Sequence, residues 1–269
     1  MAEAAGLALG TIALAGVFKD CIDLFSYFYL CQSFERDYGV IIAKLDLQKT
    51  LLLQWADRVR LLDVNYDPRL DHPRTAPSVS YVLASIRGLL SESSSLQGKY
   101  GLTSEQRWQE LHTHGNTSAD TAVVPATVSR GRMERLSEKF KALTIRADKA
   151  ARTRPVSKFG KLRWIITDKV NFEKLVQDLS DFISGLDKLV PSVGGIDQND
   201  ATRRMLEEDL ETLRDLQSTG FLHEATVSGP FHVAEPTKER FVSVIQDHIL
   251  EWIWFRAMDD RREEVNPAQ

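Results

Sequence analysis

Apolar residues recur every three or four positions along most of the chain, which is the spacing of one face of an α-helix. The clearest example is the segment 171–190, where Leu175, Leu179, Ile183 and Leu186 form one apolar stripe. No convincing alternation with a period of two residues accompanies these stripes. The predicted fold class is therefore all-α, a bundle of about seven to nine helices. The predicted helices cover residues 4–31, 35–63, 79–97, 130–151, 157–167, 171–190, 198–218 and 238–260.

Three segments between these helices have the composition of loops. Residues 65–77 contain Asp-Pro, His-Pro and Ala-Pro dipeptides, and proline disfavours helix in the residue before it. Residues 98–128 are rich in Gly, Ser, Thr, His and Asn, so we expect a long surface loop with at most a short helix near residues 103–111. The third predicted loop covers residues 219–236. The candidate N-caps are Ser78 and Asn171.

The opening of the chain is mainly apolar. Residues 4–18 are uncharged, and Lys19, Asp20 and Asp23 then interrupt the run. The only charged residue before it is Glu3, whereas a secretory signal peptide would begin with basic residues. The run is also about five residues short of the roughly 20 that span a bilayer. Taken alone, it predicts a buried core helix that comes close to the requirements of a membrane helix.

The composition is that of an ordinary soluble globular protein, with 43% hydrophobic and 27% charged residues and a formal net charge of −4. This balance argues against a dedicated nucleic-acid-binding protein. Charge is unevenly distributed, because residues 130–174 contain 14 Lys and Arg but only five Asp and Glu. Two interpretations of this basic segment remain open. It is a solvated face that pairs with the acidic helix 198–218, or a surface for anionic lipid headgroups.

No residue pattern indicates an enzyme, a metal site or a cofactor site. The close pair His112 and His114 has no acidic or cysteine residue at a zinc-ligand spacing. Gly194 and Gly195 are not followed by the Lys-Ser or Lys-Thr of a phosphate-binding loop. We therefore expect a non-enzymatic protein without a cofactor.

The two cysteines, Cys21 and Cys31, are expected on one helix. At about 1.5 Å per residue they would lie about 15 Å apart, too far for a disulfide while the helix is intact. We interpret them as buried thiols of a reducing compartment.

Three blocks of sequence follow one another in an informative order. The first is the opening, with Gly6, Gly10 and residues 15–18, and the third runs from Trp164 to residues 172–176. The second block has Phe34, Arg36, Asp37 and Tyr38, followed by Leu45 and Trp55. Together, the three blocks resemble the HeLo domain, the N-terminal module of fungal HET-S-type prion-inhibition and propagation proteins. The family-signature residues are Phe34, Arg36, Asp37, Tyr38, Leu45 and Trp55 of the second block and Trp164 of the third.

The resemblance implies a helical bundle, sometimes with a very short β-hairpin, that has a soluble resting form and no catalytic residues. It also implies a trigger that releases the N-terminal helix into a membrane, where oligomers permeabilise the cell. The Gly6-x-x-x-Gly10 spacing would let such helices approach closely. The residues expected to insert are Gly6, Leu7, Leu9, Gly10, Ile12, Leu14, Gly16, Val17 and Phe18, with Lys19, Asp20 and Asp23 as the polar boundary.

Partners are expected on the same ground. They are a second copy of the chain, as a dimer or oligomer, and anionic membrane lipids on activation. An amyloid-signalling or NLR-type protein is a further candidate, and nucleic acid is not expected. The protein would rest in the cytoplasm and move to the plasma membrane. The alternative is a non-inserting interaction module that regulates a related effector by co-assembly.

The sequence departs from the HET-S pattern near its C-terminus. Residues 1–220 form the predicted HeLo-like domain, and residues 221–269 predict a loop and a helix packed on the bundle. The two short amyloid repeats of the prion members are not evident there. Residues 252–255 read Trp-Ile-Trp-Phe, and we expect them to dock on the bundle. A role at a membrane interface or in partner binding is the alternative.

Overall fold

The protein is described here from a computed structural model. The structure describes residues 2–25, 28–29, 37–104, 128–150, 164–166, 168–191, 198–227 and 234–265.

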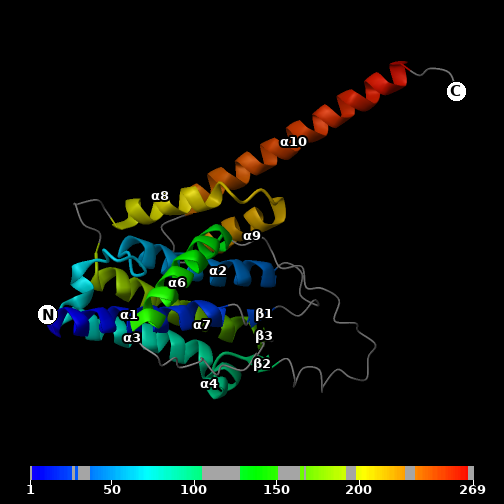
Figure 1. Cartoon of the computed structure of the whole chain (residues 1–269). Coiled ribbons are helices and arrows are strands. Elements are labelled where there is room, and N and C mark those ends of the chain that lie inside the picture. Colours follow the sequence, from blue (N-terminus) through cyan, green and yellow to red (C-terminus); the bar gives the residue numbers. More distant parts are fainter. Residues whose placement is uncertain are drawn as a thin grey trace.

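The structure confirms the predicted all-α class (Figure 1). Most of the described residues belong to helices that pack side by side, and η1 is a single turn of 3-10 helix. The helices are α1 (Ala2–Phe25), α2 (Asp37–Arg58), η1 (Pro68–Asp71), α3 (Thr75–Ser91), α4 (Ser93–Gly98), α6 (Arg130–Ala150), α7 (Lys169–Leu189), α8 (Gln198–Leu210), α9 (Leu216–Val227) and α10 (Ala234–Val265).

The main hydrophobic core lies between α1, α2, α3 and α7. Helix α1 packs chiefly on α3, α3 also packs on α7, and α2 packs on both α7 and α9. Trp55 of α2, Leu83 of α3 and Phe172 of α7 are completely buried in this core. A smaller cluster joins Leu47 of α2 to Leu210 of α8 and to α9. Helix α2 therefore contributes to both cores.

Three short strands form one sheet at an end of the bundle, in the order β1-β3-β2 (Figure 1). Strand β1 (Phe28–Tyr29) runs parallel to β3 (Trp164–Ile166), and β2 (Leu102–Ser104) runs antiparallel to β3. Phe28, Leu102 and Ile166 are buried in the main core. The short β element is thus made of three strands from distant segments rather than the two strands of a hairpin.

Two helix predictions near these strands are wrong. The first helix ends at Phe25 and not at residue 31, because residues 28–29 pair with β3. The segment 157–167 was predicted as a helix, yet residues 164–166 are a strand. Trp-Ile-Ile favours both structures locally, and a pairing partner far away in the sequence decides between them.

The C-terminal boundaries also differ. The helix predicted over 198–218 ends at Leu210, and residues 216–227 form α9, although 219–236 was predicted as a loop. Helix α9 lacks a strong apolar period because its small polar residues are buried as well, including Ser218 and Thr219.

Both predicted N-caps are wrong. Helix α7 begins after Asp168, whose carboxylate accepts a hydrogen bond from the Asn171 N–H at 3.0 Å. Asp168 is thus the cap and Asn171 the third residue beyond it. Helix α3 begins at Thr75, and Ser78 lies in its first turn, where its hydroxyl donates to the carbonyl of Arg74 at 3.0 Å.

Helix α10 packs on α9 and α8 through its first half and then projects from the bundle (Figure 1). In the packed half, Arg240 donates from Nε to the carbonyl of Leu213 at 3.0 Å, and Val244 is buried. In the projecting half, Trp252 and Trp254 are 60% and 57% exposed. The prediction that these tryptophans dock on the bundle is wrong, because the helix runs on past the elements that it packs against.

Candidate functional site: the covered N-terminal helix

The second half of α1 is buried in the bundle. Leu14, Phe18, Ile22 and Phe25 recur every three to four residues, and each is at most 6% exposed. At about 1.5–3 kcal/mol for each fully buried large apolar side chain, these four contribute about 6–12 kcal/mol. That is comparable with the whole free energy of unfolding of an ordinary domain. Helix α1 therefore leaves the bundle only if new interactions replace the free energy of these contacts.

The structure describes some of the side chains that we expected to insert. Leu14 and Phe18 are buried, Val17 is half-buried and Gly16 is exposed. Their placement agrees with a covered apolar helix, and insertion itself stays a prediction. The others belong to α1 with side chains outside the described part, namely Gly6, Leu7, Leu9, Gly10 and Ile12.

Helix α6 covers this part of α1. The ring of Phe140 stacks on that of Phe18, with centroids 6.4 Å apart. The Lys19 ammonium lies 5.9 Å from the centroid of the same Phe140 ring, within cation–π range. Leu136 of α6 also belongs to the main core. Departure of this end of α1 therefore breaks the contacts of Phe18 and Lys19 with Phe140 of the basic helix α6.

The predicted polar boundary lies where α1 faces solvent. Lys19 forms an ion pair with Asp23, one turn later on the same helix. Arg87 of α3 reaches Asp20 at 3.5 Å. All four side chains are partly exposed, so each pair contributes about 0–1 kcal/mol. The apolar contacts, and not these ion pairs, hold α1 in place.

Cys21 is a buried free thiol on α1, as predicted. It donates to the carbonyl oxygen of Leu83 in α3 at 3.3 Å. Burial raises the pKa of the Cys21 thiol from 9.0 to about 12. The thiolate is the reactive form, so Cys21 is inert while α1 stays on α3. Cys31 lies outside the described residues, and α1, which carries Cys21, ends at Phe25.

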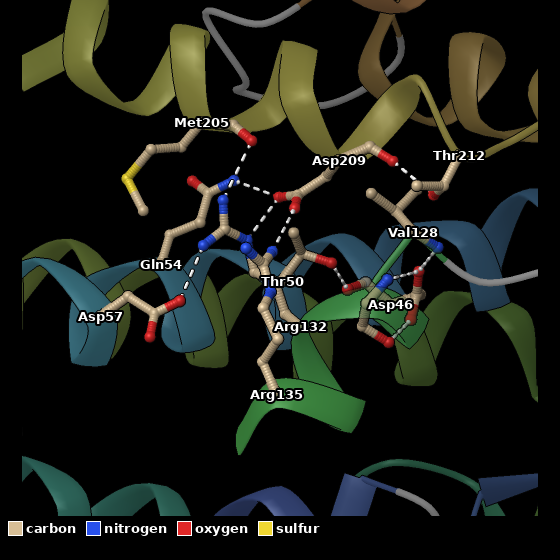
Figure 2. A network of polar contacts seen from close by, with 11 residues as sticks. Asp46, Thr50, Gln54, Asp57, Val128, Arg132, Arg135, Met205, Asp209 and Thr212 are labelled. Atoms are coloured by element: carbon tan, nitrogen blue, oxygen red, sulfur yellow. Dashed lines mark hydrogen bonds and ion pairs between the residues drawn. The ribbon is translucent and has the colours of Figure 1, made fainter. Parts of the chain in front are cut away.

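A buried ion pair ties α6 to α8 and α2 (Figure 2). Arg132 of α6 donates from Nε to Asp209 of α8 at 2.6 Å and from Nη1 to Asp57 of α2 at 2.8 Å. It also donates to the carbonyl of Met205 at 3.1 Å. Gln54 of α2 donates to the Asp209 carboxylate at 3.0 Å. The side chains of Arg132 and Asp209 are each only 3% exposed, so losing either would leave a buried charge without its nearest partner.

Asp46 of α2 holds the residues that precede α6 (Figure 2). Its carboxylate accepts hydrogen bonds from the Val128 N–H at 2.8 Å and from the Ser129 hydroxyl at 2.6 Å. Burial raises the pKa of Asp46, and these hydrogen bonds act against the shift. Burial likewise raises the pKa of Asp209, against its bonds from Arg132 and Gln54. Helix α2 thus anchors both the residues that precede α6 and the first turn of α6.

A family model described as "Prion-inhibition and propagation" matches residues 6–220. The chain belongs to the HeLo family. It is 25% identical over 229 residues to heterokaryon incompatibility protein s of Podospora anserina, covering 84% of this chain and 70% of the relative. It is 23% identical, with the same coverage, to heterokaryon incompatibility protein S of strain S of that fungus.

Solved structures agree with the HeLo assignment. The HET-s N-terminal domain has a TM-score of 0.55 at 20% identity, covering 86% of this chain and 98% of that one. A double mutant of that domain has a TM-score of 0.50 at 21% identity, covering 84% and 97%. These similarities show a shared fold.

The HeLo signature residues have different places in the structure. Leu45 and Trp55 of α2 are buried in the main core, so their role here is packing. Phe34 and Arg36 lie outside the described residues, and only the backbone is described for Asp37, Tyr38 and Trp164.

Sequence reasoning did not identify the Arg132–Asp209 pair of this HeLo domain. Asp209 lies between Leu206, Leu210 and Leu213 at helical spacing, so a carboxylate within an apolar stripe was the available signal. The pair supports the interpretation that the basic segment contacts the acidic helix. Arg130 of the same basic helix is 79% exposed, so the lipid interpretation stays open for the outer face.

Among the described residues, no group of three or more His, Cys, Asp and Glu side chains could hold a metal ion. His112 and His114 lie outside these residues. No helix in the described ranges combines the length and the apolar character that crossing a membrane requires.

Proposed function

We propose that this HeLo domain is a non-enzymatic effector of cell death in heterokaryon incompatibility. In this proposal, α1 leaves the bundle after triggered oligomerisation and enters the plasma membrane, which it reaches from the cytoplasm. The observation that carries the proposal is the burial of the apolar face of the second half of α1 against α3 and α6. The similarity to the two incompatibility proteins of Podospora anserina supports the biological setting.

Physical chemistry supports the transfer of α1 from the protein core to lipid. An apolar helix is stable in water only while its apolar face is covered. In lipid a helix satisfies its own backbone hydrogen bonds, and its apolar side chains need no protein cover. The transfer therefore returns much of the free energy that is lost when Leu14, Phe18 and Ile22 leave the core.

The length and charges of α1 set the conditions of this transfer. Its 24 residues extend about 36 Å, whereas a bilayer core is about 30 Å thick. The apolar run 4–18 is shorter than that core, so Lys19 has to lie at an interface or the bilayer has to thin. Because Lys19 pairs with Asp23 on the same helix, these two charges move together and partly neutralise each other.

The outer face of α6 supports the choice of anionic lipids. Arg130 and Arg135 are strongly exposed, and Lys141 is exposed too. Basic residues near a membrane surface gain about 1 kcal/mol each from anionic headgroups. Such binding would draw α6, which covers part of α1, towards the membrane.

An amyloid-signalling or NLR-type protein is the proposed source of the clustering signal.

Two variants at one exposed position test insertion. Ala13 is exposed and lies within the apolar run, so Ala13→Glu preserves the resting bundle. A carboxylate costs about 2.5–3.5 kcal/mol at the centre of a bilayer. Ala13→Met, of similar length but apolar, is the matched control. With each chain clustered by a fused inducible dimeriser, we expect dye release from anionic vesicles by wild type and Ala13→Met, and none by Ala13→Glu.

Cys21 gives a second readout in the Cys31→Ser variant, where it is the single thiol. With its pKa at about 12 rather than 9.0, the thiolate at pH 8 is about a thousandfold scarcer than for an ordinary thiol. We expect alkylation by iodoacetamide to be slow in the resting protein and fast after clustering on vesicles. Dye release while Cys21 stays protected would contradict the departure of α1.

The second candidate is an interaction module that never inserts and co-assembles with a related effector. The membership of α1 in the main core favours it, because a helix that supplies so much of the core is also a structural element. This candidate predicts no dye release from clustered wild type and permanent protection of Cys21.

A further inference from the structure

The flank of helix α10 carries an apolar stripe that runs from the packed half into the projecting half. Val242, Ile245, Ile249 and Trp252 lie within an arc of about 80°, at about 100° per residue. Val242, Ile249 and Trp252 are 43%, 51% and 60% exposed. Residues spaced in this way form the seam between two paired helices.

A groove adjoins the inner end of the stripe. Helices α9 and α10 line it with mostly apolar side chains, and its volume is about 490 Å³. Ile245 belongs to both the stripe and the groove wall, beside Phe241, Gly220 and Val227. An apolar groove and an exposed tryptophan thus lie on the same flank of one helix.

The tryptophan of this chain does not reach the groove of the same chain. Trp252 lies seven residues beyond Ile245 on an unbroken helix, about 10 Å further along its axis. A continuous α-helix does not fold back on itself. Trp252 can therefore enter such a groove only on another molecule.

The stripe is self-complementary in one arrangement. Its spacings of three, four and three residues read the same from either end. Two α10 helices packed antiparallel about a two-fold axis near residue 247 would place Val242 opposite Trp252 and Ile245 opposite Ile249. Each Trp252 then enters the groove of the other copy. Parallel packing would set each tryptophan against its own counterpart and leave both grooves empty.

We propose that α10 is the self-association surface of this protein and that its partner is a second copy in this antiparallel arrangement. The contact would be isologous, as in most two-fold dimers. Asp247 and Glu251 lie on the other side of the helix, so pairing buries no unpaired carboxylate. Helix α10 lies beyond residues 6–220, the part that matches the HeLo family, and pairing in solution does not depend on the membrane activity proposed above.

The size of the contact indicates its strength. The four stripe side chains of each copy bury on the order of 400–500 Å². A stable interface buries about 800 Å² per partner. We therefore expect a weak dimer with a dissociation constant in the micromolar range, populated when the chain is concentrated.

Sedimentation of the full chain over about 1–200 µM tests the proposal. Ile249→Glu and Trp252→Glu should each raise the dissociation constant at least about thirtyfold. Leu250→Glu is the matched control, because Leu250 is 64% exposed but lies about 120° away from the stripe. It should leave the dimer unchanged. Circular dichroism should show the same helix content in all three variants, since all three positions are exposed.

Cross-linking tests the arrangement. A short bismaleimide should join Val242→Cys chains to Trp252→Cys chains when the two are mixed, and should join neither variant to itself beyond the wild-type level. A wild-type chain that stays monomeric at 200 µM, a dimer insensitive to both stripe variants, or self-linking of Trp252→Cys would each overturn the proposal. A monomer whose tryptophan fluorescence shifts on phosphatidylserine vesicles would also overturn it and assign the stripe to a membrane.

Discussion

Helix α1 and the projecting half of α10 both carry large apolar side chains at helical spacing, yet their surroundings are opposite. In α1, Phe18 and Ile22 are at most 1% exposed beneath α3 and α6. In α10, Ile249 and Trp252 are more than half exposed. The difference lies in what covers each helix and not in how apolar it is. An element that others cover needs a trigger, whereas an exposed element is ready for contact in the resting protein.

This contrast divides two steps of the proposed activity between the two ends of the chain. Self-association through α10 needs no rearrangement, so it can come first. Release of α1 removes contacts worth about 6–12 kcal/mol, so it has to be driven. Clustering at a membrane could supply that free energy, because apolar contact with lipid replaces contact with α3.

The largest expected difference comes from truncating one aromatic side chain in each helix. Phe18→Ala should lower the free energy of unfolding by about 3–5 kcal/mol, because it opens a cavity between α1 and α6. Trp252→Ala should change it by about 0.5 kcal/mol or less in the monomer, since the side chain is mostly exposed. Urea denaturation at a concentration well below that of dimerisation measures both. A similar loss of free energy of unfolding in the two variants would show that Phe18 and Trp252 do not differ in how much they stabilise the monomer.

The next largest effect concerns the cover of α1. Arg132→Ala removes the partner of the buried Asp209 carboxylate and should cost about 2–4 kcal/mol at neutral pH. Of the ion pairs between α6 and Asp209, the variant keeps only the longer one, from Arg135 at 3.9 Å, so α6 is held less firmly and Cys21 should become more reactive. The control is Arg130→Ala, whose ion pair with Glu134 is exposed, with an expected loss of about 0.5 kcal/mol or less.

The Arg132→Ala variant also has a pH signature. Burial already raises the pKa of Asp209, and loss of the guanidinium raises it further. The folded state then binds a proton that the unfolded state has released, so the free energy of unfolding falls as pH rises from about 4 towards the folded pKa. The variant should therefore lie closer to wild type at pH 5 than at pH 8. Equal losses at the two pH values would show that Asp209 keeps its charge without Arg132.

Much of the fold was predictable because it depends on local periodicity. The stripe of Leu175, Leu179, Ile183 and Leu186 identified α7, and the uncharged opening run identified α1 as a helix, which is buried in its second half. Predictions failed where distant segments decide the structure. Trp164–Ile166 is a strand because it pairs with Phe28–Tyr29 and Leu102–Ser104, and no local pattern contains that information.

The candidate site was predictable in part for the same reason. The burial of the Cys21 thiol was predicted from the sequence, whereas the role of Lys19, Asp20 and Asp23 as a polar boundary stays a prediction. The Arg132–Asp209 pair was not, because its members are 77 residues apart and each resembles a surface charge. The exposure of Trp252 was also missed. The sequence shows that this side chain is apolar, but it does not show that α8 and α9 fail to extend along α10 as far as Trp252.

The smallest expected effect concerns the polar boundary and separates folding from membrane activity. Asp20→Asn removes the ion pair with Arg87, which is partly exposed, so the free energy of unfolding should fall by about 1 kcal/mol or less. In the proposed inserted state Asp20 lies at the end of the apolar run, and neutralising it should make dye release faster rather than slower, because a charge no longer resists entry into lipid. Denaturation and vesicle leakage on the same preparation measure the two quantities. Slower leakage with unchanged stability would mean that α1 stops short of Asp20 and that its boundary lies elsewhere.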